Sequence, residues 1–310
     1  MLHKVYVKLA ALPPLALSNL PENFLHAAAA LKLRRCFQCV GVLALALIGL
    51  SFAQAATPSI QCLDGTATDG IELTGSSRHC VAIQKFEHVS LDGNTRVLVV
   101  FVPGERRSSV ALPDDHGTAF NLSQRLKVST IAIEHPAYRS DAASSEVAQY
   151  DGYTPANIAI LANALVMLRT LSPGKKILLI GHSGGAAMAA LLASRYPSSA
   201  DAYLLAACPC DVPQWRQSRN ASTGKAVSWA HSLSPQDEVQ NIRADARIAL
   251  VVGNRDDDTL AKFSEAYVTR LQRRGVKTRL TYAIGATHVS VLRSPEFFML
   301  AQELADQLSR

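Results

Sequence analysis

The sequence predicts an α/β fold with a mostly parallel central sheet and helices on both faces. Strand-like and helix-like segments alternate from about residue 95 to the C-terminus, and nearly every strand-like segment is a continuous apolar run. Such runs are typical of parallel sheets, because helices cover both faces of these strands. Of the 310 residues, 48% are hydrophobic and 18% are charged, which argues against a disordered chain.

The predicted strands can be followed along the chain. The first clear strand is TRVLVVFVPG, an apolar run that ends in Pro-Gly as expected of a buried strand. Further strands are expected within residues 57–93, and antiparallel pairing is one arrangement open to them. Five later segments are also predicted strands, namely VSTIAIE, KKILLIG, DAYLLAAC, ARIALVVGN and VKTRLTYAIG.

Helical patterns lie between these strands. Thr154-Pro155 opens a long amphipathic helix, because Thr is a favoured N-cap and Pro suits the first helical position. Ser294-Pro295 opens the last helix in the same way. The other predicted helices are TAFNLSQRL, AAMAALLASRYP and TLAKFSEAYVTRLQRRG.

The longest interruption of the alternation covers residues 208–246. It contains Trp215, Trp229 and His231, and Ser234-Pro235 starts a short helix within it. We expect a small lid-like insertion here, inside a single domain that spans residues 57–310. The two tryptophans either line an acyl pocket or pack within the lid, and His231 either lines the lid or lies at the surface.

Residues 1–55 have the features of an export leader. Arg34-Arg35 precedes the apolar core CFQCVGVLALALIGLSF, and Ala53-Gln54-Ala55 fits a small-x-small cleavage site. The alternative is an uncleaved anchor, because the core has about the length of a short transmembrane span. The cleavage site favours an exported protein, periplasmic or secreted, that contacts a membrane only if the leader is retained.

The net charge of +6 comes mainly from this leader. Residues 1–55 hold five of the 31 basic residues and one of the 25 acidic residues, so the remainder carries 26 basic and 24 acidic residues. No basic stripe with interleaved aromatic residues follows. Nucleic acid is therefore not an expected partner.

Four cysteines remain after the leader. Cys62 and Cys80 flank a polar loop, and a disulfide between them is the preferred prediction for an exported chain. Cys208 and Cys210 are one residue apart, so a bridge between them is possible but strained. The spacing of the four matches no usual zinc pattern, and no metal or organic cofactor is expected.

Ser183 lies in Gly-His-Ser-Gly-Gly, between the run KILLI and an alanine-rich helix. A serine on a tight strand-to-helix turn projects its hydroxyl above the sheet, and small neighbours relieve the crowding. The helix N-terminus favours developing negative charge, and the amide of Gly184 is placed to face an oxyanion. His182 is expected to pack and hydrogen-bond, because it points away from the nucleophile.

A serine nucleophile needs a base and an acid that orients it. Acidic residues follow the fifth clear strand in Gly-Asn-Arg-Asp-Asp-Asp, and His288 follows the sixth in Gly-Ala-Thr-His. The order Ser183, Asp256, His288 is the one this architecture requires. Chemistry also gathers at the carboxyl ends of parallel strands, where all three residues lie. Asp257 is the main alternative to Asp256.

Three segments, GHSGG, VVGNRDDD and GATHVSVL, resemble the nucleophile elbow, acid turn and histidine loop of the α/β-hydrolase superfamily. SLSPQDEVQNI and AYVTRLQRRGVKTRL resemble its prolyl-oligopeptidase-like and dienelactone-hydrolase-like branch, and the resemblance spans about residues 95–305. It implies the α/β-hydrolase fold with a small lid insertion, and an acid three residues after the glycine, at Asp256. Dienelactone hydrolases carry cysteine where this chain has Ser183, and the chain has no room for the propeller domain of large oligopeptidases.

The second oxyanion amide is expected in the loop after the first clear strand. Pro103-Gly104 occupies the place of the usual His-Gly, so the backbone N–H of Glu105 is the predicted donor. His116-Gly117 lies too far past the strand and is interpreted as part of a helix cap. Tyr138 follows the second strand, where substrate loops usually lie, whereas Tyr150 and Tyr153 are ambiguous and packing alone explains them.

Together these features predict an exported serine hydrolase that cleaves a carboxylic ester through a Ser183–His288–Asp256 triad. The alternative within the same mechanism is a small serine peptidase that acts on short peptides. A third hypothesis, a non-catalytic binding protein of the same fold, normally lacks one of the three residues.

Overall fold

The computed structural model describes residues 61–64, 80–88, 96–105, 113–136, 151–224 and 229–310. The chain divides into two units, Met1–Thr57 and Pro58–Arg310, and every described residue belongs to the second. The predicted leader, and with it the choice between cleavage and anchoring, lies outside the described residues. No helix within the described ranges combines the length and apolarity needed to cross a membrane.

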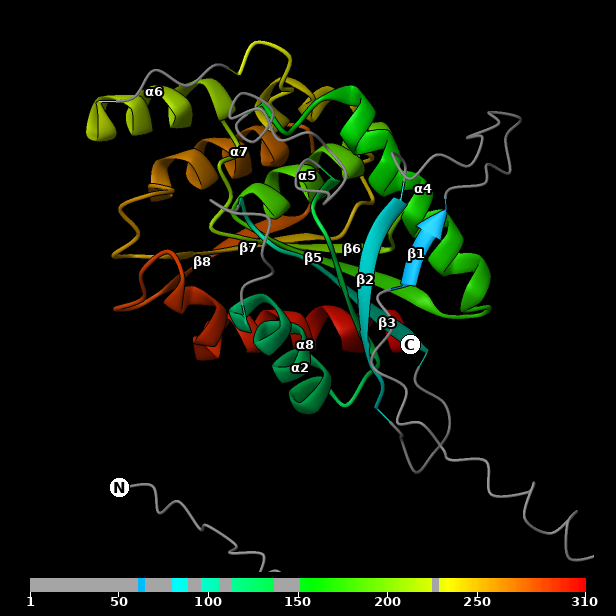
Figure 1. The fold of residues 1–310 in the computed structure, drawn as a ribbon. Helices are drawn as coiled ribbons and strands as arrows, with labels where there is room; N and C mark the ends of the chain where they lie inside the picture. The colour runs from blue at the N-terminus through cyan, green and yellow to red at the C-terminus, as the bar shows by residue number, and fades with distance from the viewer. Residues whose placement is uncertain (1–60, 65–79, 89–95, 106–112, 137–150, 225–228) are drawn as a thin grey trace, which may run out of the picture. The chain divides into compact units, whose positions relative to one another are not determined.

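The described strands form one eight-stranded sheet in the order β1-β2-β4-β3-β5-β6-β7-β8 (Figure 1). From β4 to β8 all neighbouring strands are parallel, whereas β2 is antiparallel to both β1 and β4. The mostly parallel sheet is confirmed, and the two strands within residues 57–93 take the antiparallel option. The strands are β1 (Gln61–Asp64), β2 (Cys80–Phe86), β3 (Val97–Val102), β4 (Thr130–Ile133), β5 (Lys176–His182), β6 (Ala202–Ala206), β7 (Ile248–Gly253) and β8 (Thr278–Ala283).

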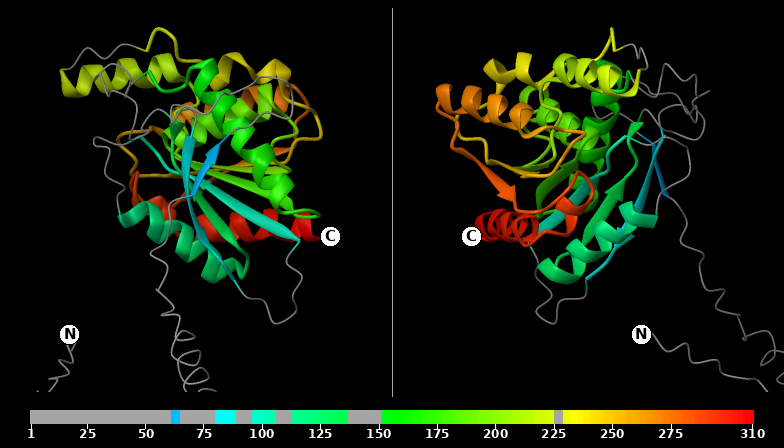
Figure 2. Two further views of the ribbon diagram at one scale, coloured as in Figure 1. Left: turned by 45° about the vertical axis from the view of Figure 1, so that its right-hand side comes forward. Right: turned by 90° about the vertical axis from the view of Figure 1, so that its left-hand side faces the viewer.

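Helices cover both faces of the sheet (Figures 1 and 2). Helices α2 (Pro113–Leu126) and α8 (Pro295–Ser309) pack against each other and against one face. Helices α4 (Pro155–Leu171), α5 (Gly184–Arg195) and α7 (Ala261–Arg273) pack against the other. This arrangement is the three-layer architecture that the alternating sequence pattern predicts.

Strand β3 shows why its sequence is apolar throughout. Successive side chains of a strand point to opposite faces. Those of Val97, Val99 and Phe101 enter the core beneath α2 and α8. Those of Leu98, Val100 and Val102 enter the core beneath α4, α5 and α7, and all six residues are buried.

Two predicted helix starts have the expected local structure. The hydroxyl of Thr154 accepts a hydrogen bond from the Asn157 amide at 3.2 Å, and that of Ser294 accepts one from the Phe297 amide at 3.2 Å. Each helix has proline at its first position. Proline lacks a backbone N–H, and an N–H at this position would have no hydrogen-bond partner within the helix. His116-Gly117 lies within α2 rather than before it.

Helix α6 (Val212–Thr223) and two 3₁₀ helices, η4 (Pro235–Asp237) and η5 (Val239–Asn241), occupy the stretch 208–246. Asp211 caps α6 by accepting a hydrogen bond from the Gln214 amide at 3.2 Å, and Gly224 ends it at φ +68°. Helix α6 lies beyond α5 and α7, on the side away from α2 and α8 (Figures 1 and 2). Whether this stretch acts as a lid stays a prediction.

Candidate active site

Ser183 occupies a sharp turn between β5 and α5. Its backbone has φ 52° and ψ −121°, a conformation that is uncommon for a residue with a side chain. The Ser183 amide donates to the carbonyl of Ala206 at 2.9 Å, which ties the turn to the end of β6. The turn therefore has the strand-to-helix geometry of a nucleophile elbow.

The glycines around Ser183 allow backbone segments to approach closely. A Cβ atom added at Gly185 would lie 2.2 Å from the carbonyl oxygen of Val102, and one added at Gly181 would lie 2.3 Å from the carbonyl oxygen of Gly185. Both distances are far shorter than any real carbon–oxygen contact. The two positions thus need glycine for contact with neighbouring backbone, which explains why the motif is glycine-rich.

Asp256 and His288 are in direct contact. Nδ1 of His288 lies 2.9 Å from Oδ2 of Asp256, whose side chain is completely buried. The other oxygen of Asp256 accepts hydrogen bonds from the backbone amides of Thr259 at 2.8 Å and Asp258 at 3.0 Å. Asp257 is exposed instead. Of the two acids that the sequence left open, Asp256 is the one that touches the histidine.

Thr259 is a member of this group that the sequence did not reveal. Its hydroxyl lies 2.6 Å from Nδ1 of His288, so two oxygen acceptors surround one ring nitrogen. A proton on Nδ1 is stabilised by both, which leaves Nε2 free to accept a proton. The only local signal is a polar side chain three residues after Asp256, and this pattern is too common to predict a contact.

His182 joins the elbow to the histidine loop. Its Nε2 lies 2.9 Å from the backbone carbonyl oxygen of His288, and the two ring centres are 4.8 Å apart. Burial, together with the neighbouring His288 ring, lowers the pKa of His182 to about 3. A carbonyl oxygen only accepts, so Nε2 of the neutral His182 ring is the donor. The prediction that His182 packs and hydrogen-bonds agrees with this arrangement.

Glu105 lies beside the elbow. A Cβ atom added at Gly184 would lie 3.4 Å from the amide nitrogen of Glu105 and 2.7 Å from the hydroxyl oxygen of Tyr153. One added at Gly104 would lie 2.9 Å from Cβ of Ser183. The loop after β3 therefore brings the Glu105 amide nitrogen close to Gly184, and its role as an oxyanion donor stays a prediction.

The side chain of Glu105 has contacts that the sequence did not predict. Its carboxylate binds the Tyr153 hydroxyl and the Arg216 guanidinium. Tyr153 is fully buried and so has a polar contact in addition to the packing that the sequence suggested.

The other predicted pocket residues have different surroundings. Trp215 is fully buried, and its indole N–H donates to Asp258 at 3.3 Å. Trp229 is partly buried and packs against the core beneath α4, α5 and α7. His231 lies at the surface with 82% of its side chain exposed, and its ring contacts Asp151 at 2.8 Å. Tyr138 lies outside the described residues.

The cysteines fall into two groups. Cys208 and Cys210 are fully buried between β6 and α6, with their sulfur atoms 2.04 Å apart. In the pairing of β1 with β2, Cys62 lies opposite Ala82 and Cys80 lies opposite Asp64. The side chains of Cys62 and Cys80 are not among those described, so their predicted bridge stays a prediction.

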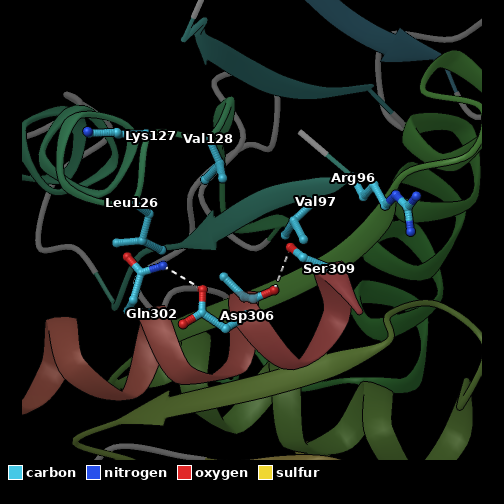
Figure 3. A pocket seen from close by; sticks show the side chains of 9 residues that line it. Arg96, Val97, Leu126, Lys127, Val128, Gln302, Asp306 and Ser309 are labelled. Carbon is cyan, nitrogen blue, oxygen red and sulfur yellow. Dashed lines mark hydrogen bonds between the residues drawn. The ribbon is translucent and has the colours of Figure 1, made fainter. Parts of the chain in front are cut away.

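Two surface pockets lie at the amino ends of the strands, away from Ser183. One, of about 250 Å³, is lined by the start of β3 and the ends of α2 and α8 (Figure 3). There the Gln302 amide donates to Asp306 at 2.8 Å, and the Ser309 hydroxyl donates to the Ala305 carbonyl at 2.9 Å. The other, of about 390 Å³, is lined by residues that include Arg169 and Tyr203. Neither pocket contains a residue of the candidate active site.

Comparison with solved structures identifies the class of fold. An esterase of Pyrococcus furiosus aligns with 74% of this chain and 88% of its own, with a TM-score of 0.58 and 16% identity. Esterase PE8 aligns with 73% of this chain and 97% of its own, with a TM-score of 0.51 and 17% identity. The chain therefore has the α/β-hydrolase fold.

A peptidase has the same fold. The proline iminopeptidase of Mycobacterium smegmatis aligns with 74% of this chain and 95% of its own, with a TM-score of 0.52 and 13% identity. No protein-family model matches the sequence, and no curated protein matches it either. At these identities the likeness establishes the fold, and function has to be argued from the site.

Proposed function

We propose that this chain is a serine hydrolase that cleaves a carboxylic ester through an acyl-enzyme. The observation that carries the proposal is the contact of Asp256 with His288 on a loop that is hydrogen-bonded to His182, the residue before Ser183. A strained serine elbow and a histidine in contact with a buried acid, all at the carboxyl ends of the strands, are the parts of a nucleophile–base–acid triad.

The proposed mechanism assigns a step to each group. Ser183 Oγ attacks the ester carbonyl, and Nε2 of His288 accepts its proton. Asp256 and Thr259 hold the proton on Nδ1 and so keep Nε2 available, while Asp256 stabilises the imidazolium. The amides of Gly184 and Glu105 bind the oxyanion. His288 then protonates the leaving alcohol, and water releases the acyl group by the same steps.

A small serine peptidase is the alternative within this mechanism. The solved structures of this fold include an enzyme named proline iminopeptidase as well as esterases. The described residues favour neither the ester nor the peptide, because the same groups attack both carbonyls. Ester hydrolysis is the first proposal because an alcohol leaves more readily than an amine.

We also propose export of the protein, on the basis of the leader sequence in residues 1–55, which lies outside the part of the chain that the structure describes. A Cys208–Cys210 disulfide is part of this proposal, since disulfides persist in oxidising compartments. The N-terminal sequence of protein recovered from the periplasm or medium tests it. Cleavage after Ala55 supports the proposal, and an intact Met1 in the cytosol contradicts it.

A fluorophosphonate probe tests the hydrolase proposal directly. We expect labelling of the wild type and hydrolysis of at least one p-nitrophenyl ester in a series of increasing acyl length. Ser183→Ala should abolish both. Ser309→Ala is the matched control. This exposed serine lies at the end of α8, in the pocket at the amino ends of the strands and away from Ser183.

Two results would contradict the proposal. One is a folded wild-type protein that the probe does not label. The other is labelling that persists in Ser183→Ala. Aminoacyl nitroanilides in the same assay separate the two substrate classes, because faster turnover of an anilide than of every ester would favour the peptidase.

A further inference from the structure

A buried ionic cluster connects the loop after β3 to helix α6. The Glu105 carboxylate, 8% exposed, accepts a hydrogen bond from the Tyr153 hydroxyl at 2.6 Å. It also accepts from both terminal nitrogens of Arg216, with Nη1 at 3.0 Å from Oε2. Arg216 is only 1% exposed, and an arginine is seldom buried this fully unless its charge is paired. The contact is thus a bidentate, desolvated ion pair.

The cluster continues to the acid turn. Arg219 lies one helical turn after Arg216, with Nη1 3.6 Å from Glu105 and Nε 3.4 Å from Asp258. The Trp215 ring lies 4.2 Å from the Arg216 guanidinium carbon. The Asp258 amide in turn donates to Asp256. Helix α6 therefore bridges the loop after β3 and the loop that carries the proposed triad acid.

The position of Glu105 makes its charge important. Its amide is the proposed oxyanion donor beside Gly184, so its carboxylate lies near the place where negative charge develops. An unpaired carboxylate there would oppose the oxyanion, and in a buried site the repulsion is poorly screened. The two guanidinium groups balance the charges of Glu105 and Asp258. The cluster can therefore hold an acidic residue at this place without a net negative charge.

We infer that Arg216 is a positioning residue for the oxyanion hole. This inference rests on the proposed serine-hydrolase function. Its bidentate contact fixes the side chain of Glu105, and so aims the Glu105 backbone N–H, while its charge neutralises the carboxylate. A planar guanidinium suits this task, because lysine offers a point charge and no paired donors in a fixed geometry.

Arg216→Met and Arg216→Lys test the inference through kcat and KM on the best ester. We expect Arg216→Met to lower kcat by about 10²–10³-fold, the effect of losing one oxyanion donor, with KM changed less than about threefold. Arg216→Lys should fall between Arg216→Met and the wild type. Titration with the fluorophosphonate counts active sites, so unfolded molecules do not enter kcat.

A second substitution separates positioning from folding. In Arg216→Met the buried Glu105 carboxylate loses its bidentate partner and keeps only the Tyr153 hydroxyl and the longer contact with Arg219, which destabilises the protein as well. Adding Glu105→Gln removes that charge but does not rebuild the bidentate contact. The double variant should recover stability and about tenfold in kcat, while staying well below the wild type. Arg169→Met is the control, because Arg169 pairs with Asp201 at 2.9 Å near the amino ends of the strands, away from the candidate active site.

The outcomes distinguish the inference from the function on which it rests. If the wild type is active and Arg216→Met keeps its kcat per titrated site, the inference is wrong and the hydrolase proposal stands. A double variant with wild-type kcat likewise reduces Arg216 to a structural role and overturns the inference. A folded wild type without labelling or turnover overturns the proposed function, and the inference with it.

Discussion

His182 donates a hydrogen bond from Nε2 to the backbone carbonyl of His288 across 2.9 Å. The residue before the proposed nucleophile thus holds the loop that carries the proposed base. Because burial lowers the pKa of His182 and keeps its ring neutral, no buried positive charge has to be compensated by a nearby acid. The contact spans 106 residues of sequence and secures the alignment of two loops that leave different strands.

The lowered pKa of His182 predicts a pH-dependent stability. Its pKa falls from the ordinary value of 6.5 to about 3, so between these values the unfolded chain binds a proton that the folded chain does not. The contribution of neutral His182 to the free energy of unfolding is therefore complete above pH 6.5 and is lost as the pH falls towards 3.

Urea unfolding of the wild type and of His182→Gln measures this contribution. The unfolding free energy of the wild type should fall more steeply between about pH 7 and pH 4 than that of the variant. Other titrating groups are common to both proteins and cancel in the difference. Parallel plots of unfolding free energy against pH for the two proteins would contradict the prediction. In a separate measurement at neutral pH, a loss of kcat in His182→Gln reports displacement of the His288 loop.

Asp256→Asn should nearly abolish turnover. Asparagine can keep the shape of the contact with His288 but favours the wrong tautomer, a change that lowers kcat by about 10⁴-fold in serine proteases. Asp257→Asn, its exposed neighbour, should change kcat by less than about threefold. Steady-state kinetics on one ester compares the two, and the opposite ranking would move the acid to Asp257.

Thr259→Val should have a smaller effect than Asp256→Asn. The hydroxyl is one of two oxygen acceptors around Nδ1 of His288, and Asp256 remains in the variant. We expect kcat to fall about five- to tenfold, the equivalent of one hydrogen bond. A loss as large as that of Asp256→Asn would make Thr259 an equal partner of the histidine.

Gly185→Ala should destabilise the fold. Its Cβ would collide with the backbone oxygens of Val102 and Pro103, at 2.2 and 2.5 Å, which neither strand nor helix can move aside cheaply. We expect the unfolding free energy to fall by about 2 kcal/mol or more.

Gly117→Ala is the control for this substitution. Gly117 lies inside α2, and an added Cβ meets no atom within 4 Å. Alanine should therefore stabilise the helix by about 0.5–1 kcal/mol. Equal unfolding curves for the two variants would show that the close approach at Gly185 is not needed.

Much of the fold was predictable because it depends on local patterns. The strand in TRVLVVFVPG is apolar throughout because each face meets a different helical layer, and Thr154-Pro155 and Ser294-Pro295 mark helix starts by their own chemistry. The elbow at Ser183 was predictable for the same reason, since glycines, strand and helix are adjacent in sequence. The order of the strands is not a local property and had to come from the structure.

The sequence by itself determined the α/β class, the serine turn and the strand ends at which an acid and a histidine follow. Only the tertiary structure showed that Asp256, and not its alternative Asp257, contacts His288, brought Thr259 to His288, and paired Glu105 with Arg216. The physical reason is distance along the chain, because Glu105 and Arg216 are 111 residues apart and no periodic pattern connects them. Local propensity shapes an element, whereas the packing of several elements decides which side chains meet.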